Sequence, residues 1–393
     1  MKKLSLLFGV LLLSGCSWFS DEEDAAITPA ELVDFNSVIS VERSWSKKVG
    51  SGTKNYLVSL RPTASSDTIF AADYEGQVMA LNPSNGQTNW QVDLETMISG
   101  GVGYGASMVM VGTIEGVVYA LDASDGSVLW TSQVSSEVLS SPKTNGKIVV
   151  VHSIDNQMVA LDAETGEELW KHDGDAPILS VRGTSESIVT SNMVISGFDS
   201  GKLIAFNGDN GSIIWETRVA LPKGKTELER MVDIDGEPLL VGDVIYAASY
   251  QGRIGAISRG TGRNLWSQDT SSHHAPAHRA GQIFVSGGED AIQAFRAGNG
   301  QAIWTNDQLF LRRITGPAVL GGTIAVADAE GYLHLLDPED GHFVGRIKVD
   351  GSGVGAPLLS VNDSLIVQAN NGSLSAYKIQ SRKILVYEVE CRT

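Results

Sequence analysis

Residues 120–130 read ALDASDGSVLW, and residues 160–170 repeat the phrase as ALDAETGEELW. Further copies end at Trp90, Trp215, Trp266 and Trp304, and a degenerate copy ends at Gly345, where glycine stands in place of the tryptophan. Successive endings lie 40, 40, 45, 51, 38 and 41 residues apart. A period near 40 residues is typical of a protein built from one supersecondary unit that is stacked many times.

Each copy predicts four β-strands. The apolar run before the phrase, such as residues 117–121, is rich in the β-branched and aromatic residues that favour strands. The phrase itself favours a hairpin turn, because Asp122 can accept bonds from backbone amides and Gly126 tolerates a positive φ. Another strand pair lies upstream, for example from residue 148. Four strands make one propeller blade, and the recurring Trp predicts a wedge between neighbouring blades.

The repeats predict an all-β fold, an eight-bladed β-propeller of four-stranded antiparallel blades over residues 41–380. Three strands follow the degenerate copy without a final Leu-Trp strand, and a matching strand exists near the start, around Trp45. We therefore expect the N-terminal strand to close the last blade, which removes the free edges of an open array. A seven-bladed ring with a stray half-repeat is the alternative. The predicted wedges are Trp45, Trp90, Trp130, Trp170, Trp215, Trp266 and Trp304.

The N-terminus predicts a lipoprotein. Residues 1–15 combine two lysines with a short apolar run, as signal peptides do, and residues 13–16 read LSGC, which resembles the bacterial lipobox. That resemblance implies cleavage before Cys16, lipidation of Cys16 and, with serine next, placement at the outer membrane facing the periplasm. Residues 16–40 are expected to form a tether, with one helical turn starting near Pro29. Residues 381–393 form a tail with Cys391, for which no role is predicted.

Composition and motifs argue against several functions. A net charge of −17 disfavours nucleic-acid binding, which requires clustered Lys and Arg. Residues 223–226 lack the glycine spacing of a phosphate-binding loop, and residues 233–244 fail the pattern of a calcium loop. His273, His274 and His278 lack a further ligand for zinc. No catalytic, metal or cofactor site is predicted.

The repeated phrase resembles the tryptophan-docking repeat of quinoprotein dehydrogenases that use pyrroloquinoline quinone. That resemblance implies an eight-bladed fold and raises an enzyme hypothesis. Those enzymes carry adjacent cysteines over the cofactor and a calcium site with a catalytic Asp. The only cysteines of this chain are Cys16 and Cys391, so the enzyme hypothesis is disfavoured.

Nearly the whole chain, up to about residue 379, resembles the BamB family, lipoproteins of the outer-membrane β-barrel assembly machinery. The motifs that carry this resemblance are LRP at 60–62, LSVRG at 179–183, TELER at 226–230 followed by DID at 233–235, and DAEGYLH at 328–334. The resemblance implies a non-catalytic scaffold that helps outer-membrane proteins insert. A periplasmic glycan-binding propeller is a further alternative.

The resemblance also implies the partner-binding residues. They lie where the period stretches to 45 and 51 residues, and the implied partner is the POTRA region of BamA within the assembly complex. Unfolded outer-membrane proteins are a further predicted partner, through addition of a strand to a blade edge. Alternatively, the two aspartates cap turns and the apolar pair packs inside a blade. The implied residues are Leu179, Val181, Arg182, Asp233 and Asp235.

Overall fold

The computed structural model describes residues 28–54, 56, 58, 60–175, 179 and 182–380. The predicted signal peptide, Cys16, Val181 and the tail with Cys391 lie outside the described residues. The described chain is built of strands, with two 3-10 helices, η1 (Leu228–Arg230) and η2 (Gly288–Asp290). Within the described residues, no helix is long and apolar enough to cross a membrane.

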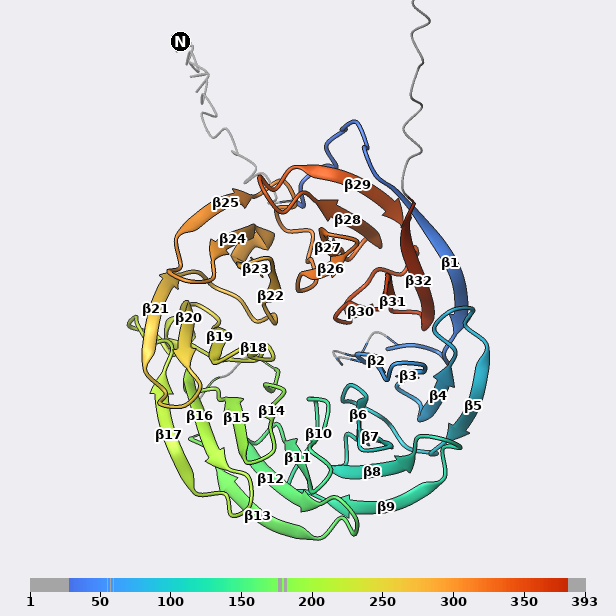
Figure 1. The fold of residues 1–393 in the computed structure, drawn as a ribbon, viewed down its shortest axis with the longest axis vertical. Helices are drawn as coiled ribbons and strands as arrows, with labels where there is room; N and C mark the ends of the chain where they lie inside the picture. Colours follow the sequence, from blue (N-terminus) through green and yellow to red (C-terminus); the bar gives the residue numbers. More distant parts are fainter. Residues whose placement is uncertain are drawn as a thin grey trace, which may run out of the picture.

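The strands form eight separate four-stranded sheets that surround a central axis like propeller blades (Figure 1). Within each blade the strands are antiparallel, and their order runs from the axis to the rim (Figure 1). The prediction of an all-β, eight-bladed propeller is confirmed, and the seven-bladed alternative is wrong.

Seven blades consist of consecutive strands. Blades 1 to 4 contain β2 (Thr63–Ala64), β3 (Ile69–Ala72), β4 (Gln77–Leu81) and β5 (Thr88–Asp93); β6 (Gly103–Gly105), β7 (Met108–Gly112), β8 (Val117–Asp122) and β9 (Val128–Gln133); β10 (Lys143–Thr144), β11 (Ile148–His152), β12 (Gln157–Asp162) and β13 (Glu168–Asp173); β14 (Ile188–Val189), β15 (Met193–Gly197), β16 (Lys202–Asn207) and β17 (Ile213–Arg218). Blades 5 to 7 contain β18 (Leu239–Val241), β19 (Val244–Ala248), β20 (Arg253–Ser258) and β21 (Asn264–Asp269); β22 (Ala277–Arg279), β23 (Gln282–Ser286), β24 (Ile292–Arg296) and β25 (Ala302–Asn306); β26 (Ala318–Leu320), β27 (Thr323–Ala327), β28 (Tyr332–Leu336) and β29 (Phe343–Lys348).

Blade 8 joins the two ends of the chain. It contains β30 (Leu359–Val361), β31 (Ser364–Gln368) and β32 (Ser373–Gln380), and its rim strand is β1 (Ser40–Lys48). The pairing of β1 with β32 runs from Ser40 opposite Gln380 to Lys48 opposite Ser373. The N-terminal strand therefore closes the ring, as the sequence predicts.

The second strand of each blade is sandwiched between the two neighbouring blades. All five residues of β7 are buried. Met108 and Met110 belong to a core shared with blade 3, whereas Val109 and Val111 face a core shared with blade 1. Burial on both faces explains why these strands read as unbroken apolar runs rather than as an alternation of apolar and polar residues.

The repeated tryptophans join each blade to the next. The indole Nε1 of Trp130 donates to the Ala163 carbonyl in the turn of blade 3, at 3.0 Å. The turn glycine, Gly166, has a φ of +75°, and a Cβ there would lie 2.6 Å from the Trp130 ring. Glycine is thus required both by the backbone conformation and by the indole. Equivalent bonds of 2.8–2.9 Å are made by Trp45, Trp90, Trp170, Trp215, Trp266 and Trp304.

Gly345 replaces the tryptophan of blade 7 for a topological reason. The next blade has no hairpin turn on which an indole could dock, because its strands β32 and β1 come from opposite ends of the chain. Residues 37–39 occupy that place instead. The amides of Val38 and Ile39 both donate to the Val344 carbonyl at 3.0 Å, and a Cβ on Gly345 would lie 3.2 Å from the Ile39 carbonyl oxygen.

Residues 28–38 form no helix, so the helical turn predicted near Pro29 is wrong. The backbone carbonyls there are used by distant side chains instead. Arg312 Nη1 donates to the Ala30 carbonyl at 2.9 Å, and Arg346 Nη1 donates to the Val33 carbonyl at 2.9 Å. This part of the predicted tether therefore lies against blade 7 and the connection that leads into it.

The two arginines are held by a buried pair of side chains on blade 7. Arg312 donates to Asp328 at 2.8 Å, and Arg346 Nε donates to His334 Nδ1 at 3.0 Å. His334 Nε2 lies 3.0 Å from the same Asp328 carboxylate. An imidazole that accepts at Nδ1 must carry its proton at Nε2, so His334 is neutral, and burial lowers its pKa in agreement.

We predict that Trp130→Ala lowers the free energy of unfolding by about 3–5 kcal/mol, because it removes a buried aromatic wedge and leaves the Ala163 carbonyl unpaired. Urea denaturation measures the change. Leu129→Ala is the matched control: Leu129 precedes Trp130 on the same strand and is 49% exposed. It should change the free energy of unfolding by no more than about 0.5 kcal/mol. Equal effects of the two substitutions would contradict the wedge role.

Candidate functional site

Two of the longest connections between blades touch each other. Residues 174–187 join blade 3 to blade 4, and residues 219–238 join blade 4 to blade 5. Ser185 Oγ donates to the Gly236 carbonyl at 3.2 Å. Gly183 lies so close to Asp235 that an added Cβ would come within 2.8 Å of its carboxylate. The two stretched repeats of the sequence thus contact each other at residues 183–185 and 235–236.

Leu179 and Arg182 lie on the first connection and face solvent. Leu179 is 44% exposed, which does not fit the alternative in which it packs inside a blade. Arg182 Nη2 donates to Glu137 Oε1 at 2.8 Å, while 41% of the Arg182 side chain stays exposed. Glu137 belongs to the connection between blades 2 and 3, so Arg182 also links two neighbouring connections.

The second connection exposes two leucines that are not among the five predicted binding residues, although Leu228 belongs to the TELER motif. Leu221 is 62% exposed and Leu228 is 63% exposed. Leu228 lies on η1, whose first turn is fixed by the Glu229 carboxylate, which accepts bonds from the amides of Lys225 and Thr226 at 2.6 and 3.2 Å. The sequence feature that could have identified them is their position in the extra residues of the 51-residue repeat, because binding residues concentrate in loops on a rigid scaffold.

Asp233 and Asp235 are turned inward. The Asp233 side chain is fully buried, and its backbone carbonyl accepts the Tyr250 amide at 2.8 Å. Both carboxylate oxygens of Asp235 are buried and accept no hydrogen bond from the described residues. Burial raises the pKa of Asp235 well above its ordinary value, and the neighbouring Asp233 and Asp199 raise it further. The five predicted residues are therefore divided: Leu179 and Arg182 are exposed, both aspartates are inside, and Val181 lies outside the described residues.

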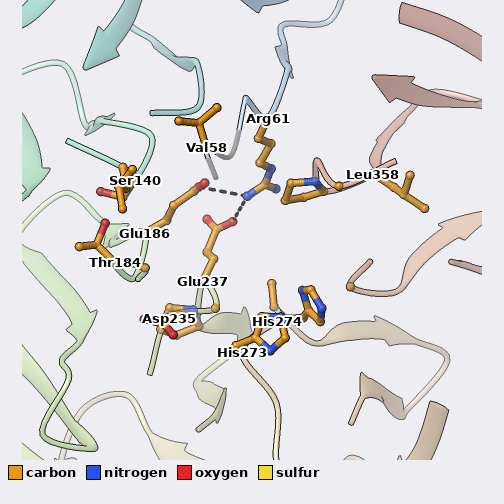
Figure 2. A pocket seen from close by; sticks show the side chains of 18 of the residues that line it. Val58, Arg61, Ser140, Thr184, Glu186, Asp235, Glu237, His273, His274 and Leu358 are labelled. Carbon is orange, nitrogen blue, oxygen red and sulfur yellow. Dashed lines mark hydrogen bonds and ion pairs between the residues drawn. The ribbon is translucent and has the colours of Figure 1, made fainter. Parts of the chain in front are cut away.

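A cavity of about 990 Å³ lies at the axis of the ring, lined by residues from several blades. Arg61 reaches into it and points at Glu186 and Glu237 (Figure 2). Its Nη1 lies 3.0 Å from the first carboxylate and 2.6 Å from the second. Lys143 completes the cluster at 2.7 and 2.9 Å from the same two carboxylates.

This cluster of Arg61, Lys143, Glu186 and Glu237 balances two positive and two negative charges across the axis. Burial alone would raise the pKa of Glu237, but Arg61 and Lys143 outweigh burial and lower it to about 2. The four groups come from the segment before blade 1, from blade 3, and from the connections that lead into blades 4 and 5. They therefore join opposite sides of the ring, whereas the tryptophans join neighbours.

The histidines of the sequence motif are not gathered into a metal site. His273 and His274 line the cavity, and burial lowers the pKa of His274 to about 3. His278 Nε2 instead accepts the Gly281 amide in a turn, at 3.2 Å. Within the part of the chain that the structure describes, no three His, Cys, Asp or Glu side chains are placed to hold a metal ion.

Comparison with known proteins identifies one family. A family model described as outer membrane protein assembly factor BamB matches residues 74–306 and 288–385. The chain is 48% identical over 379 residues to the outer membrane protein assembly factor BamB of Pseudomonas aeruginosa, covering 96% of this chain and 99% of that protein. It is 33% identical over 386 residues to BamB of Escherichia coli K12, with 95% and 98% covered.

Solved structures agree with this assignment. BamB from Moraxella catarrhalis superimposes with a TM-score of 0.80 at 27% identity, over 86% of this chain and all of that one. A quinohemoprotein alcohol dehydrogenase from Pseudomonas putida has a TM-score of 0.66 at 14% identity, over 86% and 76% of the two chains, and shares the fold alone. The repeat architecture, the shape of the ring and the relatives that match almost end to end lead to one conclusion: the chain belongs to the BamB family of outer membrane protein assembly factors.

Proposed function

We propose that this protein is a non-catalytic scaffold lipoprotein of the outer-membrane β-barrel assembly complex, and that it binds the POTRA region of BamA. Lipidation of Cys16 would hold it on the periplasmic face of the outer membrane. Eleven residues lie between Cys16 and Thr28, where the described chain begins. Such a segment spans at most about 40 Å, so the edge of blade 7 would stay close to the membrane surface.

The observation that carries this proposal is the surface formed by the two touching connections. It displays Leu179, Leu221 and Leu228, each at least 44% exposed, together with Arg182. Single exposed leucines are common on protein surfaces, but three on two connections in contact, one of which also exposes an arginine, fit a protein-binding site better. Arginine is enriched among the residues that dominate binding energy, because its planar guanidinium forms paired bonds with carboxylates.

We assign a supporting role to Asp233 and Asp235. Their inward position leaves no carboxylate for direct contact with a partner in this conformation, and Asp235 packs against Gly183 of the other connection. Substituting either residue would alter the shape of the surface that carries Leu179 and Arg182. The family resemblance and the geometry are compatible on this point, since a residue can affect binding without touching the partner.

We propose no catalytic role. Four of the charged groups that line the central cavity, Arg61, Glu186, Glu237 and Lys143, are paired with each other at 2.6–3.0 Å rather than aimed at open space. A quinone-dependent dye-reduction assay tests the dehydrogenase alternative, and turnover in that assay would overturn this part of the proposal.

Arg182→Glu should weaken binding to BamA POTRA domains by about 2 kcal/mol or more, the loss typical of a dominant interface residue, which is about thirtyfold in Kd. Co-purification from membranes and titration with purified POTRA domains measure the effect. Arg259→Glu is the matched control, because the Arg259 side chain has an exposure similar to that of Arg182, at 38%, and also pairs with a carboxylate, that of Asp243. Retention of BamA by Arg182→Glu at the level of the control would count against the interface.

The buried carboxylate of Asp235 predicts a specific dependence of stability on pH. Its raised pKa means that the folded state binds its proton more tightly than the unfolded state, so stability falls as pH rises from about 4 towards the folded pKa. Asp235→Asn keeps the shape without the charge. Its urea midpoint should exceed that of the wild type by a margin that grows over this pH range. Asp209→Asn, at an exposed turn, should show no such growth, and a margin independent of pH would refute the prediction.

A further inference from the structure

The inner ends of the two long connections are held by contacts with side chains rather than by the backbone. Among the described residues, the amides and carbonyls of residues 182–187 form no hydrogen bond with another backbone group. The same is true of residues 235–238. Regular pairing resumes only where the inner strands β14 and β18 begin. The position of each inner end therefore depends on the side chains that it presents and receives.

Glu186 and Glu237 occupy the same position in successive repeats. Each lies two residues before the inner strand of its blade, and the first residue of every inner strand pairs with the residue seven positions later. In blade order the occupants of this position are Arg61, Gly101, Ser141, Glu186, Glu237, Ala275, Gly316 and Pro357. It carries a charge only in blades 1, 4 and 5. The glycine of blade 2 and the serine of blade 3 are small enough for Arg61 to reach past them to the two glutamates (Figure 2).

Each cation of the central cluster contacts both carboxylates. Arg61 does so through a single nitrogen, Nη1, and Lys143 does so through Nζ. Ser141 Oγ adds a hydrogen bond to Glu186 at 2.9 Å. None of the four charged side chains is more than 27% exposed. Because Glu186 and Glu237 belong to different connections, the cluster forms only when the inner ends of both connections lie side by side.

A cluster of this kind contributes more to the arrangement of the chain than to its stability. The attraction between the charges is largely offset by the hydration that they lose, so replacement of such a cluster by apolar side chains is often neutral. Hydrogen bonds between charged groups nevertheless impose a geometry that apolar contacts do not. The cluster also lies directly beside the contacts of residues 183–185 with residues 235–236.

We propose that Arg61 and Lys143 are positioning residues for the surface that binds BamA: they fix the inner ends of the two connections relative to each other and thereby set the place of Arg182. This inference rests on the proposed function, in which Arg182 contacts the POTRA region. Arg182 lies four residues before Glu186, so a displacement of Glu186 is transmitted along a short segment. Neither cation is expected to touch BamA, because both line the axial cavity. The proposal also gives a role to the arginine of the LRP motif at 60–62.

A purely structural role is the alternative, and Arg312 provides the control for it. Arg312 Nη2 also contacts two carboxylates, those of Asp328 and Glu330, each at 2.8 Å. Its side chain is 3% exposed and lies in the connection that leads into blade 7. Substitution of Arg312 therefore breaks a comparable ion cluster outside the two connections that form the proposed surface.

Titration of full-length variants with purified POTRA domains tests the proposal. Arg61→Met should weaken binding about tenfold, which lies within the range by which residues remote from a ligand alter its affinity. Arg61→Lys should bind like the wild type, because one nitrogen makes both contacts of Arg61. Arg312→Met should lower the urea midpoint but also bind like the wild type. Normal binding by Arg61→Met, or equal weakening by Arg61→Met and Arg312→Met, would overturn the proposal.

A double variant covers the case in which Arg61→Met alone does not fold. Arg61→Met with Glu237→Gln removes one charge of each sign and keeps the pair of Lys143 and Glu186, at 2.7 Å. Urea denaturation verifies that it folds. Its binding should again fall about tenfold, because the remaining pair no longer joins the two connections. Wild-type affinity in this folded variant would equally refute the positioning role.

A distance measurement reports on the connections without BamA. Nitroxide labels on p-acetylphenylalanine replace Leu179 and Leu228, one exposed leucine of each connection, so both cysteines stay unchanged. Pulsed electron spin resonance should give a shifted or broader distance distribution for the double variant. Arg312→Met should give the distribution of the unsubstituted protein. An identical distribution in all three proteins would contradict the proposal.

The two measurements distinguish failure of this inference from failure of the proposed function. If Arg182→Glu binds BamA normally, the proposed interface is wrong, and the spin-label distances still decide whether the cluster positions the connections. If Arg182→Glu loses binding while folded Arg61→Met retains it, the interface stands and the positioning role is refuted.

Discussion

The structure depends on one contact: the indole of one blade seated against the glycine turn of the next. A single four-stranded sheet cannot bury both of its faces, so each blade is stable only between two others. The indole fixes the spacing and rotation between neighbours, and its Nε1 hydrogen bond satisfies a carbonyl that would otherwise be buried unpaired. Because Trp130 and Gly166 lie in successive repeats, the phrase in one copy is constrained by the phrase in the next.

The exception to this rule explains other features of the molecule. The interface between blades 7 and 8 has no turn to receive an indole, and the chain before β1 takes its place. That substitution accounts for Gly345, for the buried Val344, and for the arginines that bind the carbonyls of Ala30 and Val33. It also makes residues 30–39 part of the propeller wall at blade 7.

Much of the fold was predictable because each blade corresponds to a local sequence pattern. The number of repeats predicts the number of blades, and the unpaired strand around Trp45 predicts that the N-terminal strand closes the last blade. The prediction of a helical turn near Pro29 was wrong because the carbonyls of Ala30 and Val33 accept hydrogen bonds from Arg312 and Arg346. These arginines lie more than 280 residues away along the chain, so a local sequence pattern does not reveal the bonds. The pairing of Arg61 with Glu237 spans 176 residues, and Asp235 packs against Gly183 of the other connection. Sequence spacing carries no information about either.

The pairing of β1 with β32 has a consequence for the order in which the ring is completed. Ribosomes deliver residues 40–48 first and residues 373–380 last, so the two halves of blade 8 meet only after the intervening blades have been synthesised. Until then β1 has an unsatisfied hydrogen-bonding edge, and blades 1 to 7 form an open arc. Closure of the ring is thereby tied to arrival of the final strand, and in a chain interrupted before it the pairing edge of β1 has no partner.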